Sequence, residues 1–205
     1  YSLLKPYLVL AERLGGFDAQ INPGAPEEVI VEYAGDVAKY EVAPITIAAL
    51  KGLMSPALGE TVNFVNAPLI AKERGIKVVE IKTSAHEDFA SLISLRVKKN
   101  VGQSLIAGAL FGRGEGRVVR IDHFSLEAPL EGCMLVLRNK DKPGVIGAIG
   151  AFLGSKGINI AGMQLGREKP GGKAISLLHI DQQVSESDLE EMLSIPNIIS
   201  AHQVI

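Results

Sequence analysis

Apolar residues recur with helical spacing at the start of the chain. Between Ser2 and Leu14 they fall at positions 3, 4, 7, 8, 10, 11 and 14, and this pattern is typical of an amphipathic helix. Gly15-Gly16 follows directly and predicts the end of that helix. After a turn at Asn22-Pro23-Gly24, the alternation of residues from Val29 to Tyr33 predicts a strand.

Two further helices are predicted before the middle of the chain. The stretch from Ile45 to Leu58 is helical in its spacing and begins just after Pro44. Asn66-Ala67-Pro68 is typical of a helix start, with an N-cap residue followed by proline in the first turn. That helix should end at Arg74-Gly75, because a basic last turn and a following glycine favour a helix C-terminus.

From Ile76 the hydrophobic period shortens towards two, which indicates strands. Four are predicted: Lys77–Thr83, Ala90–Lys98, Ser104–Phe111 and Arg117–Phe124. The last two should form a hairpin around residues 112–116. This loop is rich in glycine, but it lacks the GxGxxG spacing and no helical pattern follows it. The sequence therefore contains no dinucleotide fingerprint, and no cofactor is expected in this chain.

The pattern restarts after residues 128–132, which we take as a domain boundary. Residues 1–129 are predicted to form a mixed α/β domain and residues 130–205 a second, smaller domain. In the smaller domain the expected order is strand, helix, strand, strand, helix, strand, which is typical of a ferredoxin-like α+β unit. The segments are Cys133–Arg138, Pro143–Lys156, Ile158–Arg167, Lys173–Asp181, Ser185–Leu193 and Asn197–Val204.

Composition excludes several classes of protein. Hydrophobic residues make up 47% of the chain and charged residues 21%, and 21 basic residues oppose 23 acidic ones. There is no clustered basic excess for nucleic acid, and the apolar runs are too short or too rich in glycine to span a membrane. A single cysteine, Cys133, rules out an intrachain disulfide and a thiolate metal site supplied by this chain alone.

Low cysteine use and the lack of an export signal favour a cytoplasmic protein. The first residue is not Met and lies in a periodic segment, which suggests a fragment of a longer protein. The four histidines show no metal-binding spacing, so we expect neither a metal site nor a catalytic residue here.

A polar loop between a predicted strand and helix carries the sharpest candidate site. Asp141 precedes Pro143-Gly144-Val145-Ile146, where proline suits the first helical turn and glycine permits a close approach of a ligand. The first-turn N–H groups and the helix dipole suit a carboxylate, while Asp141 suits an ammonium group. The loop could therefore hold a zwitterion. The alternative is that Asp141 simply caps the helix.

Two other places could bind a ligand. Asn159 lies between two isoleucines at a strand start, so its amide must be hydrogen-bonded, either to a turn or to a ligand. Arg113, Arg117 and Arg120 lie near the predicted hairpin and could form an anion patch. Three arginines within eight residues are also ordinary for an exposed hairpin.

Longer motifs resemble a known family. Residues 139–146 (NKDKPGVI) and 157–167 (GINIAGMQLGR) are similar to the ACT domain of bacterial D-3-phosphoglycerate dehydrogenases. Residues 61–68 (TVNFVNAP) and 71–75 (AKERG) resemble the intervening domain of the long form of that enzyme. Many amino-acid-regulated proteins share the ACT motif, whereas the two stretches in this order are more specific.

The resemblance implies a role for the chain. It implies the regulatory and oligomerising half of an enzyme that oxidises 3-phosphoglycerate with NAD and is inhibited by L-serine. The catalytic domains and their NAD site would lie upstream. In that family serine sits where two ACT domains meet, so a homodimer or tetramer is expected. Asn139 and Asp141 would come from one subunit and Asn159 from its partner. The intervening domain of some relatives binds phosphate-bearing anions, and Arg117 would match that site.

Two other functions remain open. The regulatory part of an iron–sulfur L-serine dehydratase pairs a similar intervening domain with an ACT domain, and its cluster cysteines could lie on another subunit. That family also carries a Ser-Ser-Ser-His stretch, which this sequence lacks. The other alternative is a free-standing amino-acid sensor with no enzyme attached.

Overall fold

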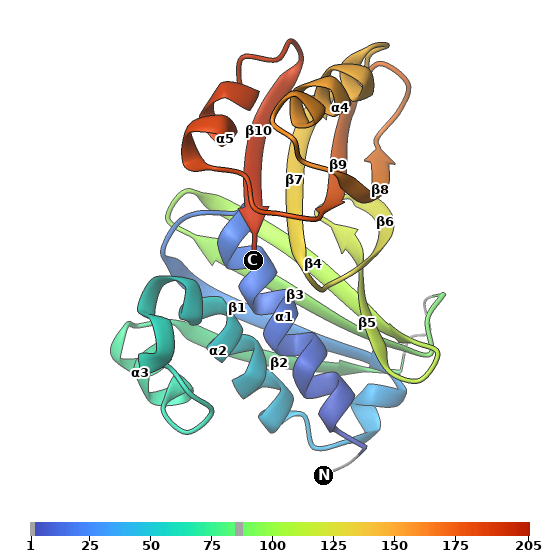
Figure 1. Ribbon diagram of the computed structural model, residues 1–205. Helices are drawn as coiled ribbons and strands as arrows, with labels where there is room; N and C mark the ends of the chain where they lie inside the picture. The colour runs from blue at the N-terminus through green and yellow to red at the C-terminus, as the bar shows by residue number, and fades with distance from the viewer. Residues whose placement is uncertain (1–2, 85–87) are drawn as a thin grey trace. The chain divides into compact units, whose positions relative to one another are not determined.

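The computed structural model describes residues 3–84 and 88–205 (Figure 1). The chain divides into two compact units, Tyr1–Asp122 and His123–Ile205. Within the described ranges, no helix is both long enough and apolar enough to cross a bilayer.

The first unit is a sheet with helices on one face. Its strand order is β2-β1-β3-β4-β5, in which β1 is parallel to β2 and the other neighbours are antiparallel. The elements are α1 (Lys5–Ile21), β1 (Pro26–Gly35), η1 (Asp36–Lys39), α2 (Ala43–Leu58), η2 (Gly59–Thr61), α3 (Ala67–Glu73), β2 (Lys77–Thr83), β3 (Ser91–Lys99), β4 (Gly102–Phe111) and β5 (Glu115–Ile121).

The core of this unit lies between the sheet and α1. Val31, Leu95 and Ile106 are neighbours across β1, β3 and β4, and each is at most 1% exposed. Leu10 and Leu14 of α1 lie over Gly108 of β4, where a Cβ atom would be only 2.9 Å from either leucine. The alternating pattern thus places one face of each strand against the helix, as its period of two requires.

The helix α1 continues through Gly15-Gly16, so the predicted end at these glycines is wrong. A Cβ at Gly15 would lie 2.2 Å from the carbonyl oxygen of Ala49 in α2, and one at Gly52 would lie 1.9 Å from that of Glu12 in α1. Gly15 and Gly52 allow the two helix backbones to approach closely because they have no side chains, and Gly15-Gly16 does not end the helix. The helix ends at Ile21, ahead of the predicted turn.

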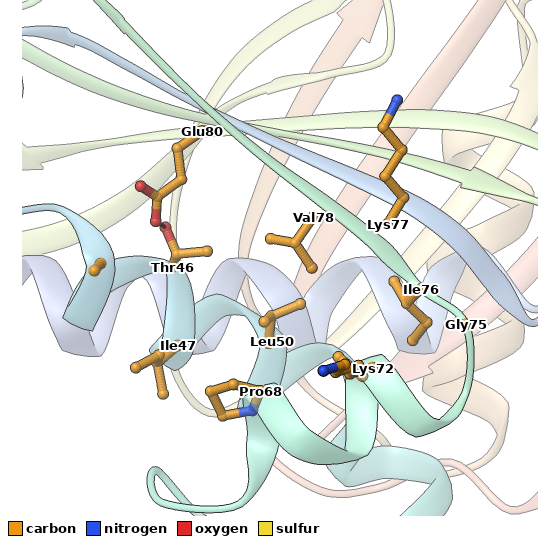
Figure 2. Close-up of a pocket in the computed structure, with 12 residues that line it drawn as sticks. Thr46, Ile47, Leu50, Pro68, Lys72, Gly75, Ile76, Lys77, Val78 and Glu80 are labelled. Carbon is orange, nitrogen blue, oxygen red and sulfur yellow. Dashed lines mark hydrogen bonds between the residues drawn. The ribbon is translucent and has the colours of Figure 1, made fainter.

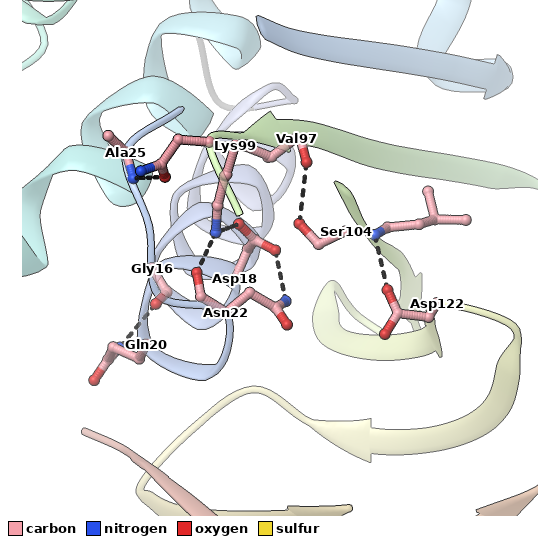
Figure 3. A network of polar contacts seen from close by, with 11 residues as sticks. Gly16, Asp18, Gln20, Asn22, Ala25, Val97, Lys99, Ser104 and Asp122 are labelled. Carbon is pink, nitrogen blue, oxygen red and sulfur yellow. Dashed lines mark hydrogen bonds and ion pairs between the residues drawn. The ribbon is translucent and has the colours of Figure 1, made fainter. Parts of the chain in front are cut away.

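A buried ion pair fastens the end of α1 to β3 (Figure 3). Asp18 is fully buried, and its carboxylate lies 2.7 Å from the ammonium of Lys99, which also donates to the Asn22 carbonyl. Asn22 Nδ2 donates to the other Asp18 oxygen at 2.9 Å. A buried charge pair is tolerated when further hydrogen bonds satisfy it, and this network meets that condition.

The predicted strand Arg117–Phe124 is interrupted. β5 ends at Ile121, and Asp122 takes a positive φ of 51° before β6 (Phe124–Pro129) begins. The division into units falls at this turn, whereas the sequence places the boundary after Pro129. The two boundaries differ in where they place β6, which belongs to the second unit and packs beside β8.

The second unit has a ferredoxin-like fold. Its sheet order is β10-β7-β9-β8, with antiparallel neighbours. Leu135, Leu137 and Leu178 of the sheet pack against Ile149 and Leu153 of α4. After β6 the elements are β7 (Cys133–Lys140), α4 (Val145–Ser155), β8 (Ile160–Arg167), β9 (Lys173–Ile180), α5 (Glu186–Met192) and β10 (Ile198–Val204).

The helix crossing gives a test on adjacent residues. Gly15→Ala should lower the free energy of unfolding by about 1–3 kcal/mol, because the new methyl group overpacks the crossing. Gly16→Ala should raise it by about 0.5–1 kcal/mol, since alanine favours helix and its Cβ would be 3.6 Å from the nearest atom, an ordinary contact. Urea unfolding of both variants measures this, and equal effects would contradict the backbone contact.

Candidate functional site

The loop from β7 to α4 is held from two sides. The Lys140 N–H donates to the carbonyl of Asn197, at the start of β10, with a distance of 2.9 Å. The Asp141 N–H donates to the carbonyl of Gly172, in the β8–β9 hairpin, with a distance of 2.8 Å. These two hydrogen bonds anchor the backbone of the candidate site to the rest of the unit.

The start of α4 differs from the sequence prediction. The helix begins at Val145, and its N-cap is Gly144 in the left-handed region with a φ of 89°. Pro143 thus precedes the helix instead of occupying its first turn, and Asp141 is not the N-cap. The reason is the conformational freedom of Gly144, which lets the chain turn abruptly into the helix.

Among the residues that the structure describes, no side chain caps α4. The first amides of a helix have no intrahelical carbonyl to bond to, and here they include those of Ile146 and Gly147. These N–H groups and the positive end of the helix dipole form a site that suits an anion.

Asp141 has a cation beside it that the sequence did not reveal. Its Oδ2 lies 3.1 Å from Nη1 of Arg167, and the side chains are 29% and 59% exposed, respectively. Arg167 comes from the end of β8 and reaches the loop because Asn139 and Arg167 both pair with Ala174 of β9. The pair is accessible, so either charge could bind the opposite charge of a ligand.

Asn139 and Asn159 lie in different environments. Asn139 is only 3% exposed; its Oδ1 accepts from Ser176 Oγ at 3.1 Å and its Nδ2 donates to the Lys140 carbonyl. Asn159 is exposed and donates to Asp181 Oδ2 at 2.8 Å. Asn139 therefore supports the strand end from within, whereas Asn159 presents its amide at the surface.

Within one chain Asn159 and Asp141 are far apart. Asn159 directly precedes β8, whereas Asp141 contacts Arg167, the last residue of this eight-residue strand. At about 3.3 Å per residue the two ends are roughly 25 Å apart. The structure thus places Asn139, Asp141 and Gly144 together and leaves Asn159 outside that group.

The strand that separates them is an edge of its sheet. β8 is terminal in the strand order, and among the described residues only β9 pairs with it. Met163 and Leu165 on this strand are 37% and 50% exposed. An exposed apolar edge strand is a ready template for pairing with another chain.

Arg117 of the suggested anion patch is engaged locally. Its Nη2 lies 3.0 Å from Glu115 Oε2, and its guanidinium stacks 4.9 Å from the centre of the Phe111 ring. Arg120 instead lines a cavity of about 160 Å³ together with Arg96 and Glu32. Arg113 and Arg117 are not among the residues that line this cavity.

Two family models match consecutive parts of the chain. Residues 3–122 match the model of the D-3-phosphoglycerate dehydrogenase intervening domain, and residues 134–197 match that of the ACT domain. The two matches follow the same order as the two compact units.

Similar proteins cover nearly the whole chain. The D-3-phosphoglycerate dehydrogenase of Synechocystis sp. is 40% identical over 98% of this chain and 36% of the relative. The enzyme of that name from Methanocaldococcus jannaschii is 40% identical over 95% and 37%, and that of Bacillus subtilis is 33% identical over 98% and 38%. The chain thus spans little more than a third of the length of these relatives.

The two asparagines should respond differently to truncation. Asn139→Ala should lower the free energy of unfolding by about 1–3 kcal/mol, because it leaves buried polar partners unsatisfied. Asn159→Ala should change it by less than about 0.5 kcal/mol, as expected for an exposed position. Guanidinium unfolding tests both variants, and a larger loss in Asn159→Ala would reverse the assignment.

Proposed function

Because the chain belongs to the family of D-3-phosphoglycerate dehydrogenases with an intervening domain and an ACT domain, we propose that it is the regulatory and oligomerising region of such an enzyme. Its ACT domain binds L-serine as a feedback inhibitor. The observation that carries this proposal is the accessible pair of Asp141 and Arg167 beside the uncapped start of α4.

The parts of serine match the parts of this loop. The carboxylate binds the first-turn amides of Ile146 and Gly147 at the positive end of α4. The ammonium group binds Asp141, which exchanges its contact with Arg167 for one with the ligand. Gly144 has no side chain to block the approach, and Asn139 holds the end of β7 from beneath.

A second copy of the chain completes the site. Antiparallel pairing of two β8 strands centred on Met163 sets Asn159 of one copy opposite Arg167 of the other. Asn159 of the first copy then lies beside the Asp141 loop of the second, where its amide reaches the serine hydroxyl. Two equivalent sites result from one two-fold axis, as an isologous interface requires.

The relatives support a proposal for the activity of the longer protein. We propose that it oxidises 3-phosphoglycerate with NAD, and that catalytic domains outside this chain hold the cofactor. The chain itself binds neither cofactor nor metal in this proposal. The relatives compared above are all named D-3-phosphoglycerate dehydrogenase, which favours this enzyme over the iron–sulfur dehydratase and the free-standing sensor.

Pairing through β8 predicts that one charged residue introduced on this strand will disrupt the dimer. Leu165→Lys should convert the dimer to a monomer at micromolar concentration, because it places a lysine from each copy along the joined apolar edge. Val101→Lys is the matched control, since Val101 is 73% exposed in the first unit and should leave the assembly unchanged. Light scattering measures both, and a Leu165→Lys dimer would contradict pairing through β8.

Serine binding can be measured by calorimetry on the same chain. Asp141→Ala should weaken binding by roughly ten- to a hundredfold, the equivalent of about 1.5–3 kcal/mol for a lost charged hydrogen bond. Asn159→Ala should cost less, because it removes a neutral hydrogen bond. Glu131→Ala, which removes an exposed carboxylate of the same unit, should bind normally. If the unaltered chain does not bind serine, or Asp141→Ala binds it normally, the assignment is wrong.

A further inference from the structure

The first unit also has an edge strand, and its role is not explained by serine regulation. β2 is terminal in the sheet order and pairs only with β1 among the described residues, from Glu28↔Lys77 to Ala34↔Thr83. Val78 and Ile81 on this strand are 37% and 42% exposed. Its outer row of N–H and C=O groups can accept another strand.

A groove of about 470 Å³ runs along this edge, between β2 and the helices α2 and α3 (Figure 2). Its floor is apolar: Val78 of β2 and Leu50 of α2 point toward each other, and Ile76 and Pro68 lie beside them. A strand added to β2 would direct every second side chain into this groove, because side chains alternate between the faces of a sheet.

The groove has a negative group at one end. Thr46 donates to Glu80 Oε1, and the Tyr33 hydroxyl lies 2.7 Å from Thr46 Oγ1. Burial raises the pKa of the Tyr33 phenol, so this group stays protonated and donates to Thr46, whose own proton points to Glu80. The hydrogen-bond chain therefore holds the Glu80 carboxylate in place.

The other end of the groove carries a positive group. Lys72 of α3 lies near Ile76, at the start of the strand (Figure 2). Two other lysines of this region are engaged within the unit, since Lys77 pairs with Glu28 at 3.1 Å and Lys82 donates to the Tyr40 carbonyl. From Ile76 to Glu80 the strand covers about 13 Å, which is the length of a short peptide.

From these features we propose that the groove binds an extended peptide segment, which joins the edge of β2 as an antiparallel strand. Apolar side chains of the segment lie opposite Val78 and Ile76. A basic residue lies opposite Glu80, and a carboxylate lies beside Lys72. An antiparallel strand has its N-terminal side at Glu80 and its C-terminal side at Lys72, so the natural charges of a peptide's two ends match the groove. Strand addition is an established mode of peptide recognition.

A second copy of β2 fits less well. In symmetric antiparallel pairing centred on Val78 or Val79, Glu80 would face Ile76 or Val78. Pairing centred on Glu80 would set two carboxylates opposite each other, which is destabilising. The charge pattern therefore favours a peptide of different sequence over self-association.

The first experiment locates and orients the peptide. The probe is the hexapeptide Arg-Thr-Val-Thr-Leu-Glu, titrated into the isotope-labelled 205-residue chain and followed by amide chemical shifts. We expect saturable shifts confined to β2, α2 and α3, with a dissociation constant below about 1 mM. The reversed peptide, Glu-Leu-Thr-Val-Thr-Arg, has the same composition and should bind at least about tenfold more weakly. Equal binding of the two peptides, or shifts elsewhere, would overturn the proposal.

A charge swap tests Glu80 directly. Glu80→Lys should weaken the affinity for the peptide that begins with arginine at least about tenfold. The same variant should bind a peptide in which glutamate replaces that arginine. Glu73→Lys makes the same charge change on an α3 residue that does not line the groove, and it should bind as the unaltered chain does. If Glu80→Lys does not fold, Lys72→Glu with a peptide ending in lysine gives the same test. Failure of the swapped peptide to recover binding would refute the charge assignment.

Methylated peptides test the backbone pairing. In an added strand, alternate amides bond to β2 and the others face away. Two versions of the peptide are compared, one N-methylated at residues 2, 4 and 6 and the other at residues 1, 3 and 5. Only the version whose methyl groups face β2 should lose binding. Equal effects would mean simple apolar contact and overturn strand addition. Shifts of β2 amides on dilution of the chain alone would identify a second copy as the occupant, which also overturns the proposal.

Discussion

At the crossing of α1 and α2 the two backbones meet with no side chain between them, because Gly15 and Gly52 face the opposite helix. Helices usually pack about 8–10 Å apart, and a contact of this kind draws them to the short end of that range. A narrow pair of helices covers less of the sheet beneath it. The edge strand β2 is the part least covered, and the groove beside it is bounded by α2 and the short helix α3.

Much of the fold could be predicted from hydrophobic periodicity. Apart from the additional strand β6, the order of strands and helices in both units agrees with the sequence analysis, because each strand buries one face and each helix one stripe. Other exceptions are positions where glycine serves tertiary packing. Gly15-Gly16 reads as a helix end from local sequence alone, but the contact that requires Gly15 comes from α2. Gly144 was placed inside a helix because its left-handed conformation depends on how the loop is anchored.

The candidate site was predictable only in its local part. Asp141 and the start of α4 are close in sequence, so their proximity follows from the motif. Arg167 reaches them through the register of β9 with both neighbouring strands, and register over such separations is not visible in one sequence. The two asparagines show the same limit. Neighbouring isoleucines suggested burial of Asn159, whereas the structure buries Asn139 against Ser176.

The packing of α1 affects how the first unit folds during its synthesis. Leu10 lies against Gly108 and Gly116, which belong to β4 and β5, the last strands of this unit. During synthesis the helix leaves the ribosome before those strands, and its apolar face has no sheet to cover it until they follow. Contacts between distant parts of a chain also slow the folding of a domain. Throughout that interval the newly made helix exposes apolar surface of the kind that chaperones protect.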